Sequence, residues 1–455
     1  MSNEKGEITV NNINESKYLP TLAPEEKADL QKSFKAAVQK TVSENIEMMK
    51  KVPNRPKAME HFDRVEDFFG QREQEIREFK AQGGKVVGFA CMLAPVELIL
   101  AAGAIPVRID SGFYTPSKIG DRIVPVEVCP VVRSMIGLAM ADLYPYLEMC
   151  DVIISPNTCD GKTKVCEILT DAFPVWEMNV PRVKDTPQAK NYWLEQVKEI
   201  KEKIEKLTGR SIHRKAMRNA IQTTLKATEA SRRLLELRKG SPAVISGRDA
   251  MLVSQMSYYD DIPRWTEKVN QLCEELERKV SEKAYVAPEN TPRILLTGSP
   301  MIWPDCWKIP NLIEESKPQG LIVADEFCSG DRIFYDPVGV DEGSSGDMLK
   351  AIAERYVLPC TCPCFTSEDG NRDRIDKLLT LVKDYKISGV IYHVIRGCHL
   401  YAMEYLRLKR LFEKENIPIY YLDTEYSRED SGQMKTRIEA FLEMLATKTQ
   451  TDDLY

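Results

Sequence analysis

The sequence predicts an α/β protein built from two similar doubly wound parallel-sheet domains with an added helical region. Three observations lead to this prediction. Short apolar runs alternate with helical stretches between residues 85 and 181, and the same alternation returns between residues 293 and 447. Strands that alternate with helices of this length indicate a parallel sheet covered on both faces. The residues between the two series, 188–285, carry the Lys, Glu and Leu pattern of amphipathic helices.

The elements of the first half follow from this pattern. A polar N-terminus, residues 1–20, is expected to be a loose tail. Helices are predicted within 24–82, since Pro24 suits a helix start and Gly83–Gly84 a stop. Strands are predicted at 85–90, 104–109, 151–156 and 174–181, with helices at 94–103, 134–147 and 162–173.

The second half repeats this order after a linker-like stretch at 287–292. Strands are predicted at 293–300, 320–326, 357–360, 389–395 and 417–424, and the last helix at 431–447. The expected division is therefore a tail with helices (1–82), a first α/β domain (83–187), a helical region packed on it (188–286) and a second α/β domain (287–455). The two domains are expected to face each other across a cleft.

Composition narrows the class of protein. The chain has 455 residues, a net charge of −6 and 43% hydrophobic residues, which is typical of a globular protein and gives no sign of a nucleic-acid surface. The longest apolar stretches are too short to cross a membrane, and the polar N-terminus lacks the layout of a signal peptide. We therefore expect a cytoplasmic protein. No P-loop, dinucleotide fingerprint or nucleophile elbow is present, so any ATP must be bound by another protein.

Cysteines are the most informative residues. Of the twelve, Cys91, Cys159, Cys328 and Cys398 each follow a predicted strand. The carboxyl ends of strands are where open α/β sheets place their ligand sites. Several thiolates gathered at such an edge suit an iron–sulfur cluster. Other cysteines, such as Cys273 on a helical pattern, are interpreted as buried structural residues, as are Cys150 and Cys166.

The densest group of thiols is the segment PCTCPC, residues 359–364. Its prolines prevent a helix. A turn here would present Cys360 and Cys364 to one metal while Cys362 faces elsewhere. Zinc is a rival to iron at this point, because zinc also takes four thiolates.

Several motifs in this order resemble those of the 2-hydroxyacyl-CoA dehydratase and benzoyl-CoA reductase family. They are GFACMLAPVELILAAGAIPVRI with Cys91, VCPVVRSMIGLA with Cys129, SPNTCDGKTKVCE with Cys159, ADEFCSGDRIF with Cys328, and VIYHVIRGCHLYAMEY with Cys398. The PCTCPCF and CDGKTK segments are most similar to the family's double-cubane branch, in which two four-iron cubanes share a bridging sulfide.

This resemblance implies a cofactor and a set of site residues. The cofactor would be a 4Fe-4S cluster, or two linked as a double cubane. Its ligands would be Cys91, Cys129 and Cys398, completed by Cys159, Cys328 and one or two of Cys360 and Cys364. Beyond the thiols, cations would balance the charge of the cluster and histidines would deliver protons to the substrate. The cations are Arg133, Arg332 and Arg396, and the histidines are His393 and His399.

The resemblance also implies a function and partners. We expect an iron–sulfur reductase that receives low-potential electrons from a separate ATP-dependent activator protein, which carries its own iron–sulfur cluster, and reduces a small-molecule substrate. A homodimer is expected. Two alternatives stay open: a 2-hydroxyacyl-CoA dehydratase component that eliminates water through a ketyl radical, and a non-catalytic cluster- or zinc-binding protein.

Overall fold

The computed structural model describes residues 18–65, 69–340, 342–367 and 371–452, and its core consists of two four-stranded parallel sheets. The first sheet has the order β2-β1-β3-β4 and the second the order β6-β5-β7-β8, so the two sheets share one topology. This confirms the predicted fold class. The strands are β1 (Val86–Phe89), β2 (Ile105–Arg108), β3 (Val152–Pro156), β4 (Val175–Met178), β5 (Arg293–Gly298), β6 (Leu321–Glu326), β7 (Gly389–Ile395) and β8 (Ile419–Thr424).

Five strands are buried along their whole length because both faces of each sheet are covered, and the polar side chains they carry lie mostly at their ends. Every residue of β1, β3, β5, β6 and β7 is buried. Parallel strands buried on both faces are expected to read as continuous Val, Ile and Leu runs, which is why the sequence revealed them. The covering helices are α4 (Val96–Ala101), α5 (Tyr114–Gly120), α6 (Pro130–Ala141), α7 (Pro145–Glu148), α8 (Asp160–Leu169), α13 (Lys308–Glu315), α14 (Ser345–Val357), α15 (Arg372–Asp384), α16 (His399–Lys414) and α17 (Ser431–Asp452), with short 3₁₀ turns η2 (Asp305–Trp307) and η3 (Asp331–Phe334).

Two predicted elements differ from the structure. The strand expected at 357–360 is absent, because Val357 still belongs to α14 and Pro359 follows within an irregular segment. The helix expected at 134–147 divides into α6 and α7, since Asp142 adopts a left-handed conformation with φ of 48°. Pro145 then starts a new short helix, a position that proline favours.

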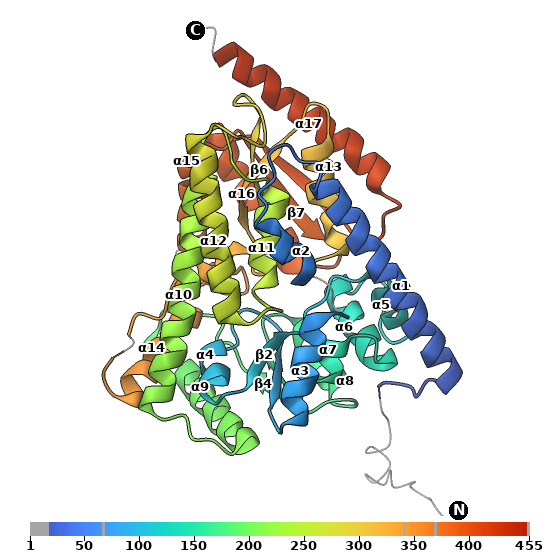
Figure 1. The fold of residues 1–455 in the computed structure, drawn as a ribbon, viewed down its shortest axis with the longest axis vertical. Helices are drawn as coiled ribbons and strands as arrows, with labels where there is room; N and C mark the ends of the chain where they lie inside the picture. Colours follow the sequence, from blue (N-terminus) through green and yellow to red (C-terminus); the bar gives the residue numbers. More distant parts are fainter. Residues whose placement is uncertain (1–17, 66–68, 341, 368–370, 453–455) are drawn as a thin grey trace, which may run out of the picture.

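The helical regions connect the two halves. Figure 1 shows α10 and α12 running side by side along the molecule, from the second sheet to the first. On its way α10 packs on α4 of the first half and on α14 of the second, and α11 packs on β6. These helices are α9 (Pro187–Thr208), α10 (Arg214–Arg238), α11 (Gly247–Met256) and α12 (Ile262–Ser281); the N-terminal helices are α1 (Pro24–Met49), α2 (Met59–Val65) and α3 (Gln71–Ala81).

The carboxyl ends of the two sheets face each other. Gly112, four residues after β2, forms an isolated parallel bridge with Pro304, which follows β5. Just beyond β8, the hydroxyl of Tyr426 donates a hydrogen bond to the carbonyl oxygen of Ser111 at 3.0 Å. Loops that leave the strands of both halves therefore meet in one place. In the part of the chain that the structure describes, no helix has the length and apolar character needed to span a membrane.

Candidate functional site

The predicted cysteines lie in the loops that leave these strands. Cys91 and Cys328 each come two residues after a strand, β1 and β6 respectively. Cys159 follows β3 and Cys398 follows β7, each by three residues. Because the carboxyl ends of the two sheets are opposed, these four thiols lie on the two sides of one interface.

Three cysteines stand at helix N-termini. Cys129, Cys159 and Cys398 immediately precede α6, α8 and α16. Neither Cys129 nor Cys398 caps its helix with a side-chain hydrogen bond, but backbone N–H groups of the first turn act to lower the pKa of both thiols. A helix N-terminus favours a negative charge and so stabilises the thiolate form that binds metal. Burial nevertheless raises the pKa of Cys129 to about 11.

Cys129 and Cys398 come together across the two halves. Gly397, beside Cys398, packs directly against the backbone of Cys129. Burial raises the pKa of Cys398, and the negative charges of Cys129 and Cys159 raise it further. Three thiols that are far apart in the sequence therefore influence one another electrostatically.

The segment from 359 to 364 adds three more thiols. The ammonium group of Lys184 donates to the carbonyl oxygen of Cys360 at 2.7 Å and holds this segment against the first half. A hydrogen bond from the Cys364 thiol is the main reason that the pKa of Cys362 lies below its usual range. The charge on Cys362 in turn raises the pKa of Cys328 and of Cys398, after the larger effect of burial. Cys362 is not among the ligands expected from the sequence, yet its charge acts on two of them, Cys328 and Cys398.

Cys91 is held in a strained conformation. Its φ of 101° lies in a region that residues with a side chain rarely adopt. Such strain persists only where the surroundings enforce it, and it often marks a functional site. The N–H of Cys91 donates to Oδ2 of Asp110 at 2.8 Å. Burial is the main cause of the raised pKa of Cys91, and the charge of Cys328 contributes next.

Eight cysteines from loops spread over most of the chain therefore influence one another electrostatically. They are Cys91, Cys129, Cys159, Cys328, Cys360, Cys362, Cys364 and Cys398. A ninth, the buried Cys306 in η2, is linked to them only through the charge of Cys129. Among the residues that the structure describes, no three His, Cys, Asp or Glu side chains are grouped closely enough to hold a single metal ion.

Buried cations on the first half face these thiols. Lys162, one turn into α8, forms an ion pair with Asp110, and the Nε of Arg108 lies 3.1 Å from the same carboxylate. Burial alone would raise the pKa of Asp110, but Lys162 and Arg108 outweigh it and lower that pKa. Arg108 also donates to the carbonyl oxygen of Cys328 at 2.9 Å, which links the halves. Arg108 and Asp110 could have been predicted as site residues, because they lie at and just after the carboxyl end of β2, where open α/β sheets place their ligand sites.

Two further cations lie on the second half. Arg332 contacts Glu326 at 2.6 Å, and Arg374 contacts the same carboxylate at 2.8 Å. Burial opposes ionisation of Glu326, but the two guanidinium groups lower its pKa to about 2. Both arginines also lower the pKa of Cys362. Arg332 was predicted from the sequence. Arg374 lies in the first turn of α15, away from any predicted motif, and no sequence signal indicated it.

The other predicted cations and the histidines have different surroundings. Arg133 is buried and pairs with Asp121 at 2.5 Å and with Glu425. Arg396 is mostly exposed, with 60% of its side chain accessible. His393 is fully buried in β7, and burial lowers its pKa to about 4, so its ring is neutral at pH 7. His399 is exposed at the start of α16.

A polar cavity of about 230 Å³ adjoins the thiols. Cys360 lies in its wall, and so does Met92, which follows Cys91. Arg332 and Lys377 also line it, and Lys377 lies 4.0 Å from the centre of the Tyr335 ring. Burial lowers the pKa of Lys377. The cavity is large enough for a small molecule and would bring it beside Cys360.

The chain is a two-sheet α/β protein with thiols in the loops between opposed strand ends, and the relatives that it matches are named as enzyme subunits. The profile of the 2-hydroxyglutaryl-CoA dehydratase D-component family matches residues 91–445, and the chain belongs to this family. Membership agrees with the resemblance found in the sequence motifs.

Curated relatives support this membership over most of their length. The Escherichia coli (strain K12) protein named "Putative dehydratase subunit YjiM" is 29% identical over 81% of this chain and 94% of its own length. The (R)-phenyllactyl-CoA dehydratase beta subunit of Clostridium sporogenes is 24% identical, over 81% of the chain and 94% of its own length. A benzoyl-CoA reductase subunit of Thauera aromatica is 23% identical, over 77% and 87% respectively. Each relative is named as one subunit of an enzyme.

Proposed function

We propose that this chain binds an iron–sulfur cluster between its two sheets and uses it to reduce a small molecule. The observation that carries the proposal is the connected group of eight thiols between the opposed strand ends. Thiolates are the ligands that iron–sulfur clusters take, and one cubane takes four of them. Eight thiols exceed that number, which favours two linked cubanes.

The residues around the thiols would suit a bound iron–sulfur cluster. A cluster held by thiolates carries negative charge, and Lys162, Arg108, Arg332 and Arg374 would balance it from both halves. The N-termini of α6, α8 and α16 add their positive ends to the same place. Asp110 and Glu326 fix these cations in position. When bound, the cluster would supply electrons one at a time at low potential.

The chain's own residues would bind and orient the substrate. The 230 Å³ cavity beside Cys360 limits that substrate to a small molecule. Its lining holds three cations, Arg332, Arg355 and Lys377, and two carboxylates, Asp336 and Asp373. Since the sequence holds no ATP-binding motif, we assign the electron supply to a separate ATP-dependent activator with its own iron–sulfur cluster. We place the protein in the cytoplasm, where thiols stay reduced.

Anaerobic purification followed by iron and acid-labile sulfide analysis tests this proposal. We expect about eight iron atoms per chain, as two linked four-iron units require. Reduction by the activator and ATP, followed by turnover of a small reducible substrate, would then support the reductase. Stoichiometric zinc without labile sulfide would contradict it, and a cluster that is reduced without any turnover would favour a non-catalytic carrier.

A second candidate is a 2-hydroxyacyl-CoA dehydratase component, which the names of the dehydratase relatives favour. A single cubane with an open iron position would then act as a Lewis acid. The two candidates differ in measurable ways. The dehydratase predicts about four iron atoms per chain, retained in Cys159→Ala and Cys360→Ala, and an unlike partner subunit. The reductase predicts loss of iron in both variants and a homodimer, so native mass measurement separates them as well.

A further inference from the structure

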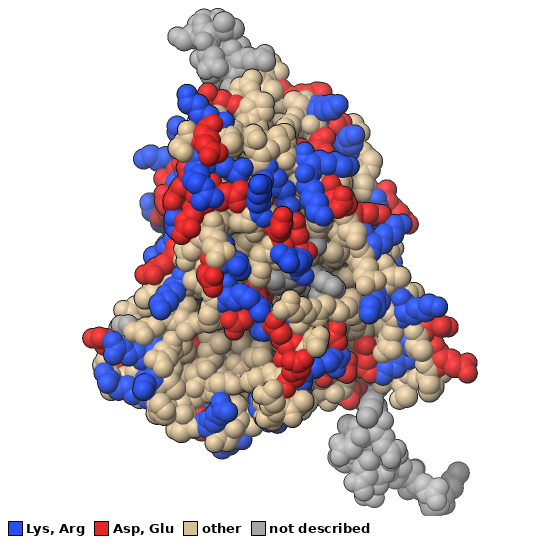
Figure 2. Space-filling view, in the orientation of Figure 1, with Lys and Arg blue, Asp and Glu red and all other residues tan. Residues whose placement is uncertain are grey.

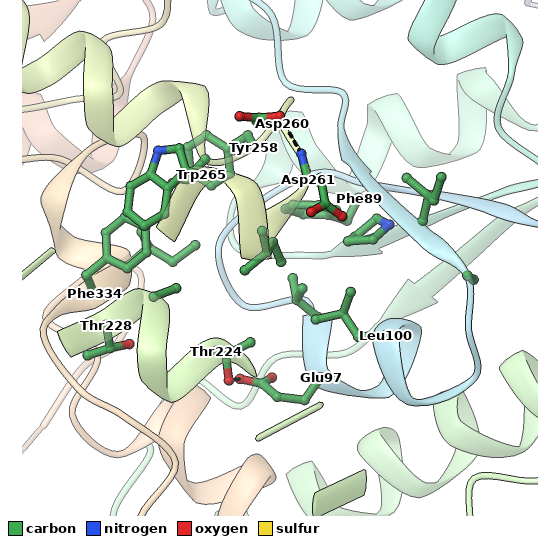
Figure 3. A pocket seen from close by; sticks show the side chains of 18 of the residues that line it. Phe89, Glu97, Leu100, Thr224, Thr228, Tyr258, Asp260, Asp261, Trp265 and Phe334 are labelled. Carbon is green, nitrogen blue, oxygen red and sulfur yellow. Dashed lines mark hydrogen bonds between the residues drawn. The ribbon is translucent and has the colours of Figure 1, made fainter. Parts of the chain in front are cut away.

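A second cavity, larger and less polar than the one beside Cys360, lies between α4, α10 and α12. Its volume is about 300 Å³. Figure 2 shows uncharged side chains over this hollow part of the surface, and Figure 3 shows the cavity from close by. Apolar pockets of this size are typical binding sites for small molecules or for one group of a larger ligand.

Aromatic and aliphatic side chains form its two main walls. Trp265 stacks on Phe334 with ring centres 5.0 Å apart and planes 6° from parallel. Figure 3 shows this stacked pair across the cavity from Leu100 and Phe89. The indole N–H of Trp265 already donates to the carbonyl oxygen of Val253 at 2.8 Å, so the ring offers the cavity its apolar face. Such walls suit a flat ring or a branched chain.

The charged residues around the cavity disfavour an anion. Among the described lining residues, the carboxylates of Glu97, Asp260 and Asp261 outnumber the guanidinium groups of Arg72 and Arg355. Both guanidinium groups are already engaged: Arg72 donates to the carbonyl oxygen of Tyr259 at 2.8 Å, and Arg355 to that of Asp336 at 2.9 Å.

Glu97 is also satisfied within the fold. Its two oxygens accept hydrogen bonds from Thr224 at 3.1 Å and from Tyr356 at 2.7 Å. Asp260 is paired with Arg264, so the cavity holds little unpaired charge of either sign. A ligand carboxylate or phosphate would therefore find no uncommitted positive partner among the described lining residues, and desolvating it there would be costly.

The cavity is close to the thiols but separate from them. Tyr356 and Arg355 line both cavities and stand between them. At the inner end, the ring of Tyr258 packs against Arg108, with the guanidinium carbon 4.3 Å from the ring centre. Arg108 in turn donates to the carbonyl oxygen of Cys328. One layer of side chains thus divides this cavity from the candidate cluster site.

We infer that this cavity is a binding site for an uncharged aromatic or branched aliphatic group. It does not depend on a bound cluster, because no thiol lines it among the described residues. Its occupant contacts the stacked Trp265–Phe334 pair on one side and Leu100 on the other.

Calorimetric titration of the full-length protein with benzyl alcohol, and in parallel with benzoate, tests this inference. The two probes share a ring and differ in charge. Benzyl alcohol is expected to bind at one saturable site, at least about tenfold more tightly than benzoate. Absence of saturable binding, or equal binding of the two probes, would overturn the inference.

Two variants locate the site. Ala227→Leu fills the cavity from α10, and Leu100→Trp fills it from the opposite wall. Each should weaken the binding of benzyl alcohol by about tenfold or more, since the ring loses its space. Glu229→Leu, at an exposed position of the same helix, is the control and should bind as the unchanged protein does. Wild-type affinity in both filled variants would refute the assignment.

A crystal soaked in 4-bromobenzyl alcohol locates the ligand without any variant. The bromine anomalous peak is expected between Trp265 and Leu100, and a peak elsewhere would contradict the inference. None of these results depends on the iron content, so this inference and the proposed cluster can fail independently.

Discussion

The backbone of Gly397 lies against the backbone of Cys129, although the two residues belong to opposite halves of the molecule. A Cβ placed on Gly397 would lie 2.8 Å from the nitrogen of Cys129 and 2.5 Å from the carbonyl oxygen of Glu127. Gly397 also has a φ of 81°, which favours glycine. The contact brings Cys398 beside Cys129, so the geometry of the candidate site depends on the absence of a side chain here.

Gly397→Ala should therefore reduce both iron content and stability. The new methyl group must push apart the two loops that bear Cys129 and Cys398, in addition to a conformational cost of about 1–2 kcal/mol at positive φ. Iron analysis and thermal unfolding measure the two effects. Gly209→Ala is the matched control, because Gly209 has a φ of 65° and open space around it. The control should lose a little stability and keep its iron; equal iron in both variants would contradict the argument.

Cys362→Ala should lower the iron content as strongly as Cys360→Ala. The charge of Cys362 acts on Cys328, Cys364 and Cys398, so we expect its removal to take one ligand from the proposed cluster. Cys273→Ala is the control, because Cys273 is buried in α12 within the apolar core. If Cys362→Ala retained all its iron while Cys360→Ala lost it, Cys362 would not be a ligand.

Lys162 and Asp110 should be strongly coupled. Both side chains are largely buried. Removing Asp110 leaves the charge of Lys162 without its ion-pair partner, at a cost of about 3–5 kcal/mol, whereas Asp110 still has Arg108 as a partner when Lys162 is removed. In a double-mutant cycle with Lys162→Met and Asp110→Asn, the coupling free energy of unfolding should reach about 1–3 kcal/mol. The exposed pair Lys198 and Glu195 provides a control cycle, with an expected coupling of about 0–1 kcal/mol. Similar values in the two cycles would refute the prediction.

Glu326 should make the iron-free protein sensitive to acid. Its pKa falls from 4.5 to about 2 on folding, so the folded state binds its proton less readily than the unfolded state. The resulting stability, on the order of 3 kcal/mol, is fully present above about pH 4.5. It is lost as the pH falls from there towards 2, where the carboxyl group becomes protonated in the folded state too.

Unfolding titrations between pH 5 and about pH 3 measure this dependence. The free energy of unfolding should fall more steeply in the unchanged protein than in Glu326→Gln, by up to about 1.4 kcal/mol per pH unit. Glu229→Gln, at an exposed position, should keep the steep dependence. Equal slopes in the unchanged protein and Glu326→Gln would mean that Glu326 does not couple folding to protons.

The sequence alone determined the two-sheet fold and most of the cysteines at its centre. Strands such as β1 and β7 were readable because parallel strands buried on both faces are continuous apolar runs. Four cysteines could be predicted as site residues because each follows a strand, where open α/β sheets place their ligand sites: Cys91, Cys159, Cys328 and Cys398. Both signals are local, since each depends on a few consecutive residues.

Tertiary structure decided the remaining features of the site and the apolar cavity, because these features are formed by segments that meet only after folding. The position of Cys362 depends on how the irregular segment after α14 packs. The position of Arg374 depends on its ion pair with Glu326, a residue of β6 that lies 48 residues earlier in the sequence. The apolar cavity exists only where α4, α10 and α12 converge. Contacts between distant segments are fixed by the packing of the whole chain, so they cannot be predicted from a short stretch of sequence.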